Sequence, residues 1–161
     1  MTRVGWIGLG AMGAPMATCV ARAGHTVTAF DIDPQKAAAL AGDGVKVAAT
    51  VSDAAANADV LVLMVATAEQ AESVLYGDGN AAAALKPGSV VLLMATVGPA
   101  AVQDWAKRLQ PAGVEIVDAP VSGGATRAGH GDLLIMVSGS ETALAAAMCT
   151  PHSNWLTSFT F

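Results

Sequence analysis

Charged side chains are scarce in this sequence. Asp, Glu, Lys and Arg make up 13% of its 161 residues, whereas hydrophobic residues make up 53%. An average soluble domain is about one quarter charged. We therefore expect much of the chain to be covered, either by helices on both faces of a sheet or by a partner. The formal net charge of −5 argues against nucleic acid and anionic membranes as partners, because both require clustered Lys and Arg.

Cysteines and long apolar runs are scarce as well. The two cysteines, Cys19 and Cys149, are isolated in the sequence, so we expect neither a disulfide framework nor a metal site, but reduced thiols in a cytoplasmic protein. The apolar run at 60–66 is followed by Thr67 and Glu69. A membrane-spanning helix needs about 20 apolar residues. We therefore expect no transmembrane segment.

Short apolar runs alternate with alanine-rich segments of helical length. We predict strands at Arg3–Gly8, Thr26–Asp31, Val45–Val47, Val60–Val65, Ser89–Met94, Glu115–Asp118 and Leu133–Val137. We predict a first helix over about Ala11–Ala23, and later helices beginning near Pro34, Ser52, Ala68, Pro99 and Glu141. Strands made almost entirely of Val, Leu, Ile and Met indicate a sheet covered on both faces. The pattern predicts a single α/β domain over 1–149, with a doubly wound, mostly parallel sheet, and an atypical tail at 150–161.

A glycine-rich motif follows the first predicted strand and begins the first predicted helix. It reads Gly8, Leu9, Gly10, Ala11, Met12, Gly13 and matches G-x-G-x-x-G. In a Rossmann-type fold, Gly8 permits the tight turn, Gly10 lets the backbone approach a pyrophosphate, and Gly13 allows close packing of helix and strand. The pyrophosphate of a dinucleotide meets the free N–H groups of the first helix. The motif therefore predicts dinucleotide binding.

Asp31 ends the second predicted strand, 18 residues after Gly13. At that position a carboxylate accepts hydrogen bonds from the ribose hydroxyls and repels a 2′-phosphate, and no Arg follows it. The cofactor we predict is NAD rather than NADP. The alternative role for Asp31 is a turn or helix-cap residue before Pro34, which Asp33 fills equally well.

Two blocks of the sequence resemble the β-hydroxyacid dehydrogenases, the family of 3-hydroxyisobutyrate, 2-hydroxy-3-oxopropionate and L-threonate dehydrogenases. The first is the segment 8–17 with Ala23-Gly24-His25. The second is the segment 118–124, Asp-Ala-Pro-Val-Ser-Gly-Gly, continuing through Ala128, Gly131, Leu133 and Met136. The resemblance covers about residues 3–140. It implies an oxidoreductase that transfers a hydride between NAD and a small β-hydroxyacid, with a faint preference for the L-threonate members.

The resemblance also implies roles for individual residues. Ser122, Gly123 and Gly124 would bind the carboxylate and neighbouring hydroxyl of the substrate, which suits an N–H-lined glycine turn. Met64, Val65 and Thr96 would contact the nicotinamide half of the cofactor. Met64 and Val65 are equally explained as core residues, and Thr96 as a helix cap.

The sequence departs from this family after Glu141. Relatives continue into a helical domain that carries a catalytic Lys in a Gly-rich motif, and no such motif occurs here, so we assign no catalytic residue. We expect little turnover from a chain without this general acid/base. The alternatives are a catalytically inactive dinucleotide-binding module and an NAD sensor. Apolar surface left uncovered would favour a homo-oligomer.

Overall fold

Six parallel strands form the main sheet in the computed structural model, which describes residues 1–148. The strands are β1 (Arg3–Ile7), β2 (Thr26–Phe30), β3 (Val45–Val47), β4 (Val60–Leu63), β5 (Val90–Leu93) and β6 (Glu115–Asp118). Their order in the sheet is β3-β2-β1-β4-β5-β6, and every neighbouring pair is parallel. This confirms the predicted doubly wound Rossmann-type α/β fold. The predicted tail, 150–161, lies outside the described residues.

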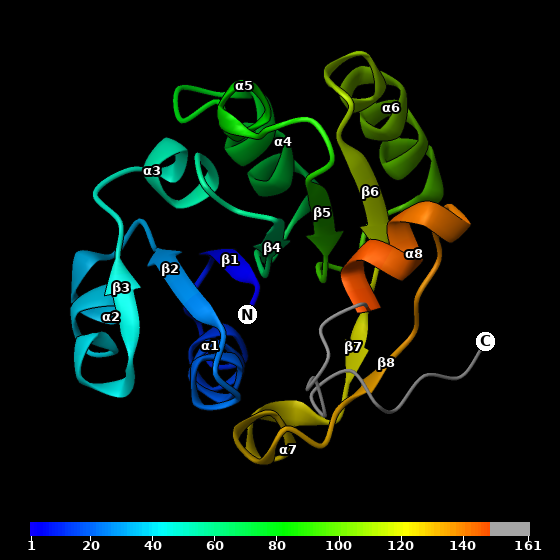
Figure 1. Ribbon diagram of the computed structural model, residues 1–161. Helices are drawn as coiled ribbons and strands as arrows, with labels where there is room; N and C mark the ends of the chain where they lie inside the picture. The colour runs from blue at the N-terminus through cyan, green and yellow to red at the C-terminus, as the bar shows by residue number, and fades with distance from the viewer. Residues whose placement is uncertain (149–161) are drawn as a thin grey trace.

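Helices cover both faces of this sheet (Figure 1). They are α1 (Gly13–Arg22), α2 (Pro34–Ala38), α3 (Val51–Ala55), α4 (Ala68–Tyr76), α5 (Ala81–Ala84), α6 (Pro99–Leu109), α7 (Gly124–His130) and α8 (Glu141–Met148), with short 3₁₀ turns at Ala41–Asp43 and Gln110–Ala112. The helices α3, α4, α5 and α6 pack on one face, and α1, α7 and α8 pack on the other. No helix among the described residues is long and apolar enough to cross a membrane.

Strand β4 shows why both faces need a cover. All four of its residues are buried. Val60 and Val62 contribute to the core beneath α1 and α8, whereas Leu61 and Leu63 contribute to the core beneath α3 to α6. Alternate residues of a strand point to opposite faces, so an unbroken apolar strand is stable only between two helical layers.

Polar caps and prolines fix several helix starts. Asp33, Thr50 and Thr67 precede α2, α3 and α4, and each side chain accepts a hydrogen bond from a backbone N–H in the first turn. Pro34 and Pro99 lie in the first turns of α2 and α6, where the missing proline N–H costs nothing. These local signals explain why the predicted helix starts agree with the structure to within about two residues.

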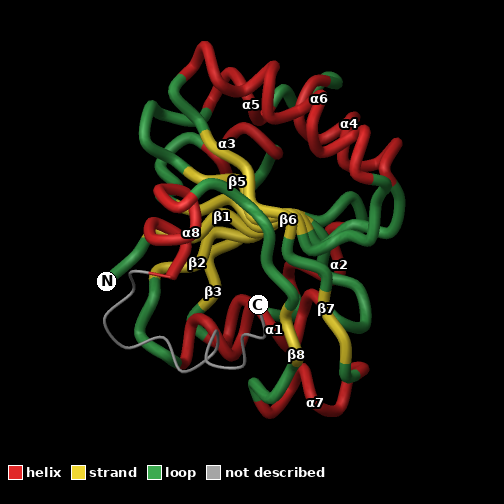
Figure 2. Tube along the Cα trace, turned by 90° about the vertical axis from the view of Figure 1, so that its right-hand side faces the viewer, coloured by secondary structure: helices red, strands yellow, loops and turns green. Residues whose placement is uncertain are grey.

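The region after β6 differs from the prediction. Val121–Ser122 forms a strand, β7, which pairs antiparallel with β8 (Leu134–Ile135) in a separate two-stranded sheet. An isolated antiparallel bridge between Asp118 and Ser138 connects this pair to the main sheet, and Figure 2 shows the pair apart from the six main strands. The predicted strand Leu133–Val137 is therefore shorter than expected.

Candidate functional site

The glycine turn, residues 8–13, lies at the carboxyl end of β1. Backbone hydrogen bonds join this end to both neighbouring strands: the Gly8 N–H donates to the Phe30 carbonyl at 3.0 Å, and the Met64 N–H donates to the Ile7 carbonyl at 2.8 Å. Because β2 lies on one side of β1 and β4 on the other, the turn is at the point where the strand order changes direction. Ligands of doubly wound folds bind in the crevice at this point.

Packing within the protein requires glycine at two positions of the turn. Gly8 has a φ of +98°, and a Cβ added there would lie 2.3 Å from the Met64 carbonyl oxygen. A Cβ added to Gly13 would lie 2.0 Å from the Gly8 carbonyl oxygen. That same oxygen accepts a hydrogen bond from the indole Nε1 of Trp6 at 3.1 Å. Gly8 and Gly13 thus have the tight-turn and close-packing roles that the motif predicts.

Gly10 differs from both, because the packing of the described residues does not require glycine there. A Cβ added to Gly10 would meet no described atom within 4 Å, and its φ lies outside the left-handed region. The residue is exposed. A side chain could fill this space without cost to the fold. The dinucleotide-binding motif requires the space to be empty, because the backbone must approach a bound phosphate closely.

The start of α1 completes this cradle. No side chain caps the helix, in contrast to α2, α3 and α4. Within the described chain, no residue accepts a hydrogen bond from the backbone N–H of Ala11, Met12 or Gly13. A helix of ten residues directs these N–H groups and the positive end of its dipole outward, and this arrangement suits an anion. The residues present therefore fit a dinucleotide pyrophosphate.

Asp31 lies beside the glycine turn, immediately after β2. Its Oδ2 accepts a hydrogen bond from the Leu9 N–H at 2.6 Å, and its Oδ1 accepts one from the Asp33 N–H at 2.9 Å. The Lys36 ammonium lies 3.8 Å from Oδ1, a neighbour that the sequence analysis missed. The next residue, Ile32, has 92% of its surface exposed, so an apolar side chain borders the position expected for the adenosine.

Met64, Val65 and Thr96 lie at the same carboxyl edge of the sheet, after β4 and β5. Met64 is half-buried against the core beneath α1, and Val65 is half-buried against the core on the other face. Part of each side chain is therefore core, as the alternative interpretation expected, and part is accessible. Thr96 is exposed. The helix-cap alternative for Thr96 is wrong, because Gly98 occupies the N-cap position of α6.

The second glycine-containing turn, Ser122–Gly124, connects β7 to α7. All three residues are exposed, and both glycines have positive φ, +141° at Gly123 and +76° at Gly124. Helix α7 packs against α1, where the Cys19 thiol donates to the Ala128 and Gly129 carbonyls at 3.5 and 3.3 Å. Contacts between α7 and α1 thus attach this turn to the helix that begins at the first turn.

Asp118, at the end of β6, was not singled out as a site residue by the sequence analysis. Its Oδ1 is buried and has no hydrogen-bond partner in the described part of the chain, and desolvation raises the pKa of the carboxyl group above its ordinary value. A carboxylate that burial strips of water without a compensating partner binds its proton more tightly. Only its position at the start of the Asp-Ala-Pro block could have indicated it.

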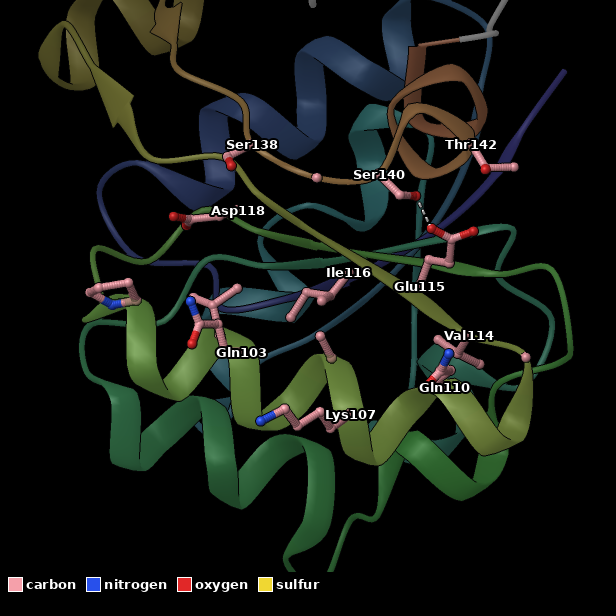
Figure 3. A pocket seen from close by; sticks show the side chains of 15 residues that line it. Gln103, Lys107, Gln110, Val114, Glu115, Ile116, Asp118, Ser138, Ser140 and Thr142 are labelled. Carbon is pink, nitrogen blue, oxygen red and sulfur yellow. Dashed lines mark hydrogen bonds between the residues drawn. The ribbon is translucent and has the colours of Figure 1, made fainter.

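A cavity of about 710 Å³ runs along β6 between α6 and the segment 138–142 (Figure 3). Asp118 and Ser138 lie toward one end, and Gln110, Val114 and Glu115 lie toward the other, where Ser140 donates a hydrogen bond to Glu115. None of the predicted cofactor or substrate residues lines this cavity. This cavity is therefore not part of the candidate site, which is defined by the backbone geometry of the glycine turn and the start of α1. Residues 1–148 contain no cluster of His, Cys, Asp and Glu suited to a metal ion.

The chain is similar in sequence to several known proteins. The family model that matches the chain, over residues 3–150, is the NAD binding domain of 6-phosphogluconate dehydrogenase. An L-threonate dehydrogenase of Cupriavidus necator is 40% identical over 144 residues, covering 89% of this chain and 48% of the relative. A 2-(hydroxymethyl)glutarate dehydrogenase of Eubacterium barkeri is 39% identical over 139 residues, covering 86% and 46%.

A solved structure shows the same fold. The crystal structure of a 3-hydroxyisobutyrate dehydrogenase from Salmonella typhimurium matches with a TM-score of 0.86 and 39% identity, covering 91% of this chain and 51% of that one. The chain spans about half the length of the curated relatives it matches.

Proposed function

This chain belongs to the family of the NAD-binding domain of 6-phosphogluconate dehydrogenase, and from that membership we propose that it is the cofactor-binding domain of an oxidoreductase acting on a small β-hydroxyacid. The observation that carries the proposal is the open space at Gly10, beside an uncapped helix start and at the point where the strand order reverses. The three features together form a cradle for a diphosphate.

Within the cradle, each residue of the turn has a defined task. Gly8 and Gly13 set the path of the backbone, and Gly10 leaves room for the diphosphate. The N–H groups of Ala11, Met12 and Gly13 donate to its oxygens. Leu9 contributes only its backbone, because its side chain is 2% exposed and lies in the core.

The remaining cofactor contacts follow the edge of the sheet. Asp31 accepts hydrogen bonds from the adenosine ribose, and its negative charge disfavours a 2′-phosphate. Met64, Val65 and Thr96 border the nicotinamide half. Bound NAD supplies the hydride acceptor, and the protein supplies the orientation. Lys36 lessens the repulsion of a 2′-phosphate, so the preference for NAD is expected to be smaller than Asp31 alone would produce.

Ser122, Gly123 and Gly124 are proposed to bind the carboxylate and hydroxyl of the substrate. The exposed serine hydroxyl and the two positive-φ glycines support this role, since successive backbone N–H groups in such a turn form an anion-binding concavity. We assign no general acid or base among residues 1–148. The relatives and the conformation of this turn support a small hydroxyacid as the substrate class.

Gly10→Ala tests the proposal directly. The new methyl group meets no atom of residues 1–148 within 4 Å, so the free energy of unfolding should stay constant or rise by up to about 1 kcal/mol. The methyl group would occupy the diphosphate position, so we expect NAD affinity measured by calorimetry to fall by at least about tenfold, or about 1.4 kcal/mol. Titration of the unaltered chain with NADP should give weaker binding than NAD.

Gly42→Ala is the matched control. Gly42 also has open space around the added Cβ, but it lies in the 3₁₀ turn before β3, so both stability and NAD affinity should be unchanged. Two results would contradict the proposal: no binding of either dinucleotide to the unaltered chain, or full NAD affinity in Gly10→Ala.

A further inference from the structure

Asp31 connects two turns that are far apart in the sequence. Its Oδ2 accepts from the Leu9 N–H in the β1–α1 turn at 2.6 Å, and its Oδ1 accepts from the Asp33 N–H in the β2–α2 turn at 2.9 Å. The Asp31 side chain is only 7% exposed. Hydrogen bonds from backbone N–H groups to a buried carboxylate are charge-assisted and stronger than neutral ones.

The bond to Leu9 reaches the middle of the glycine turn. The Leu9 side chain is buried in the core at 2% exposure, so the residue is fixed by its side chain on one side and by its N–H on the other. Gly10 follows directly and has no side chain to restrict it. A glycine loses more conformational entropy on ordering than any other residue. Because Leu9 is fixed, its neighbour Gly10 is already partly restricted, and less entropy remains to be lost when a ligand binds.

The same carboxylate has capacity left for a ligand. An ionised carboxylate offers about four lone-pair sites, and two accept the backbone N–H groups of Leu9 and Asp33. The Lys36 ammonium, 3.8 Å away and about half exposed, compensates part of the charge. Asp31 can therefore accept hydrogen bonds from the glycine turn and from a ribose at the same time.

We infer that Asp31 is a positioning residue for the glycine turn, in addition to its proposed contact with the ribose. It holds Leu9 so that the backbone at Gly10 and the N–H groups of α1 form the diphosphate cradle in the absence of ligand. This inference rests on the proposed function, which supplies the dinucleotide as ligand. The hydrogen bond that fixes the Leu9 N–H is present without any ligand.

The test compares two ligands on Asp31→Ala. The ligands are NAD and its analogue that lacks both the 2′- and the 3′-hydroxyl of the adenosine ribose, and affinities are measured by calorimetry. A residue that acts only through these ribose hydroxyls would matter for NAD and not for the analogue. A positioning residue matters for both, so we expect each ligand to bind about tenfold more weakly or worse. Asp31→Asn keeps one carbonyl oxygen and should restore part of the analogue's affinity.

Hydrogen exchange supplies a readout without ligand. In Asp31→Ala we expect the Leu9 amide to exchange at least about tenfold faster than in the unaltered chain, because its acceptor is gone. Ser140→Ala is the matched control: it also removes a side-chain acceptor at a helix start, where Ser140 accepts from the Ala143 N–H at 3.0 Å. Ser140 lies beside the edge strand β6, which is separated from β1 by β4 and β5. This control variant should change neither affinity nor Leu9 exchange.

Failure of the inference and failure of the proposed function give different results. The inference is overturned if Asp31→Ala weakens NAD while the analogue binds as before, or if Leu9 exchange is unchanged. The proposed function fails instead if the unaltered chain binds neither ligand, and Leu9 exchange then still tests the positioning role. If Asp31→Ala does not fold, the same comparison is made with Asp31→Asn, for which a loss confined to NAD contradicts the inference.

Discussion

The two glycine-containing turns differ in what surrounds them. The first turn, residues 8–13, contacts β2, β4 and the Trp6 indole, and two of its glycines have backbone atoms within 2.3 Å of an added Cβ. The second turn, Ser122–Gly124, is exposed. The three atoms nearest to an added Cβ at Gly123 belong to side chains, and an added Cβ at Gly124 meets no described atom within 4 Å. The first turn follows a central strand of the main sheet, whereas the second follows a strand of the separate two-stranded sheet.

This difference separates two uses of glycine. In the first turn the protein's own packing requires Gly8 and Gly13, and only Gly10 is left for the proposed ligand to explain. In the second turn the backbone conformation requires glycine, and the atoms nearest to Gly123 belong to flexible side chains rather than to the backbone. Glycine substitutions should therefore lower the free energy of unfolding more in the first turn than in the second. A glycine of the first turn that can be replaced without loss of stability should mark the position of a ligand.

Gly13→Ala should have the largest effect. The new Cβ would lie 2.0 Å from the Gly8 carbonyl oxygen, and backbone atoms cannot move aside without displacing β1 or α1. We expect the free energy of unfolding, measured by urea denaturation, to fall by about 3 kcal/mol or more. Gly10→Ala, three residues earlier, is the control and should retain full stability. Equal stability of the two variants would abolish the distinction within the first turn.

Gly123→Ala should have an intermediate effect. Its φ of +141° is strained for any residue with a Cβ, and the nearest contact is the flexible Leu133 side chain at 2.9 Å. We expect a loss of about 1 to 2 kcal/mol in the same assay. Gly129→Ala within α7 is the control, since its nearest contact is an ordinary 3.9 Å and alanine favours the helix. A loss at Gly123 as large as that at Gly13 would refute the comparison.

Asp118→Asn, just before the second turn, should have the smallest effect and one that depends on pH. Burial raises the carboxyl pKa above 3.8, so the folded state favours the protonated form. The stability that this form contributes is complete below about pH 3.8 and is lost as the pH rises through the raised pKa. At neutral pH the uncharged amide avoids that loss, so we expect the variant to be more stable by less than about 1 kcal/mol, because Asp118 is only partly buried. Thermal unfolding at pH 7 and below pH 4 measures this; a variant less stable at pH 7 would contradict it.

Most of the main sheet could be predicted from the sequence, because its signals are local. An unbroken apolar run such as Val60–Leu63 indicates a strand that is buried on both faces. Pro99 indicates a first helical turn. Gly8, Gly10 and Gly13 indicate their turn through their spacing together with their place between a predicted strand and a predicted helix. For the same reason the carboxyl-edge positions of Asp31 and Thr96 followed from the strand ends.

Other features depend on contacts between distant residues. Strand β7 has two residues and no pattern of its own; it exists because Val121 and Ser122 pair with Ile135 and Leu134. The glycines of α7 disfavour a helix, and packing against α1 stabilises it. The approach of Lys36 to Asp31 and the absence of a hydrogen-bond partner for the Asp118 Oδ1 within residues 1–148 arise from side-chain positions that no spacing rule specifies.

The short length of β3 has a consequence for association. A sheet edge presents unpaired backbone groups to which another chain can add a strand. Here one edge is the three-residue strand Val45–Val47, with Lys46 at its centre, and the outer side of the opposite edge strand is bonded to Ser138 through Asp118. A short edge strand that carries a lysine disfavours the addition of strands from other copies of the chain. We therefore expect that this chain, despite its apolar composition, does not form fibres through its sheet edges.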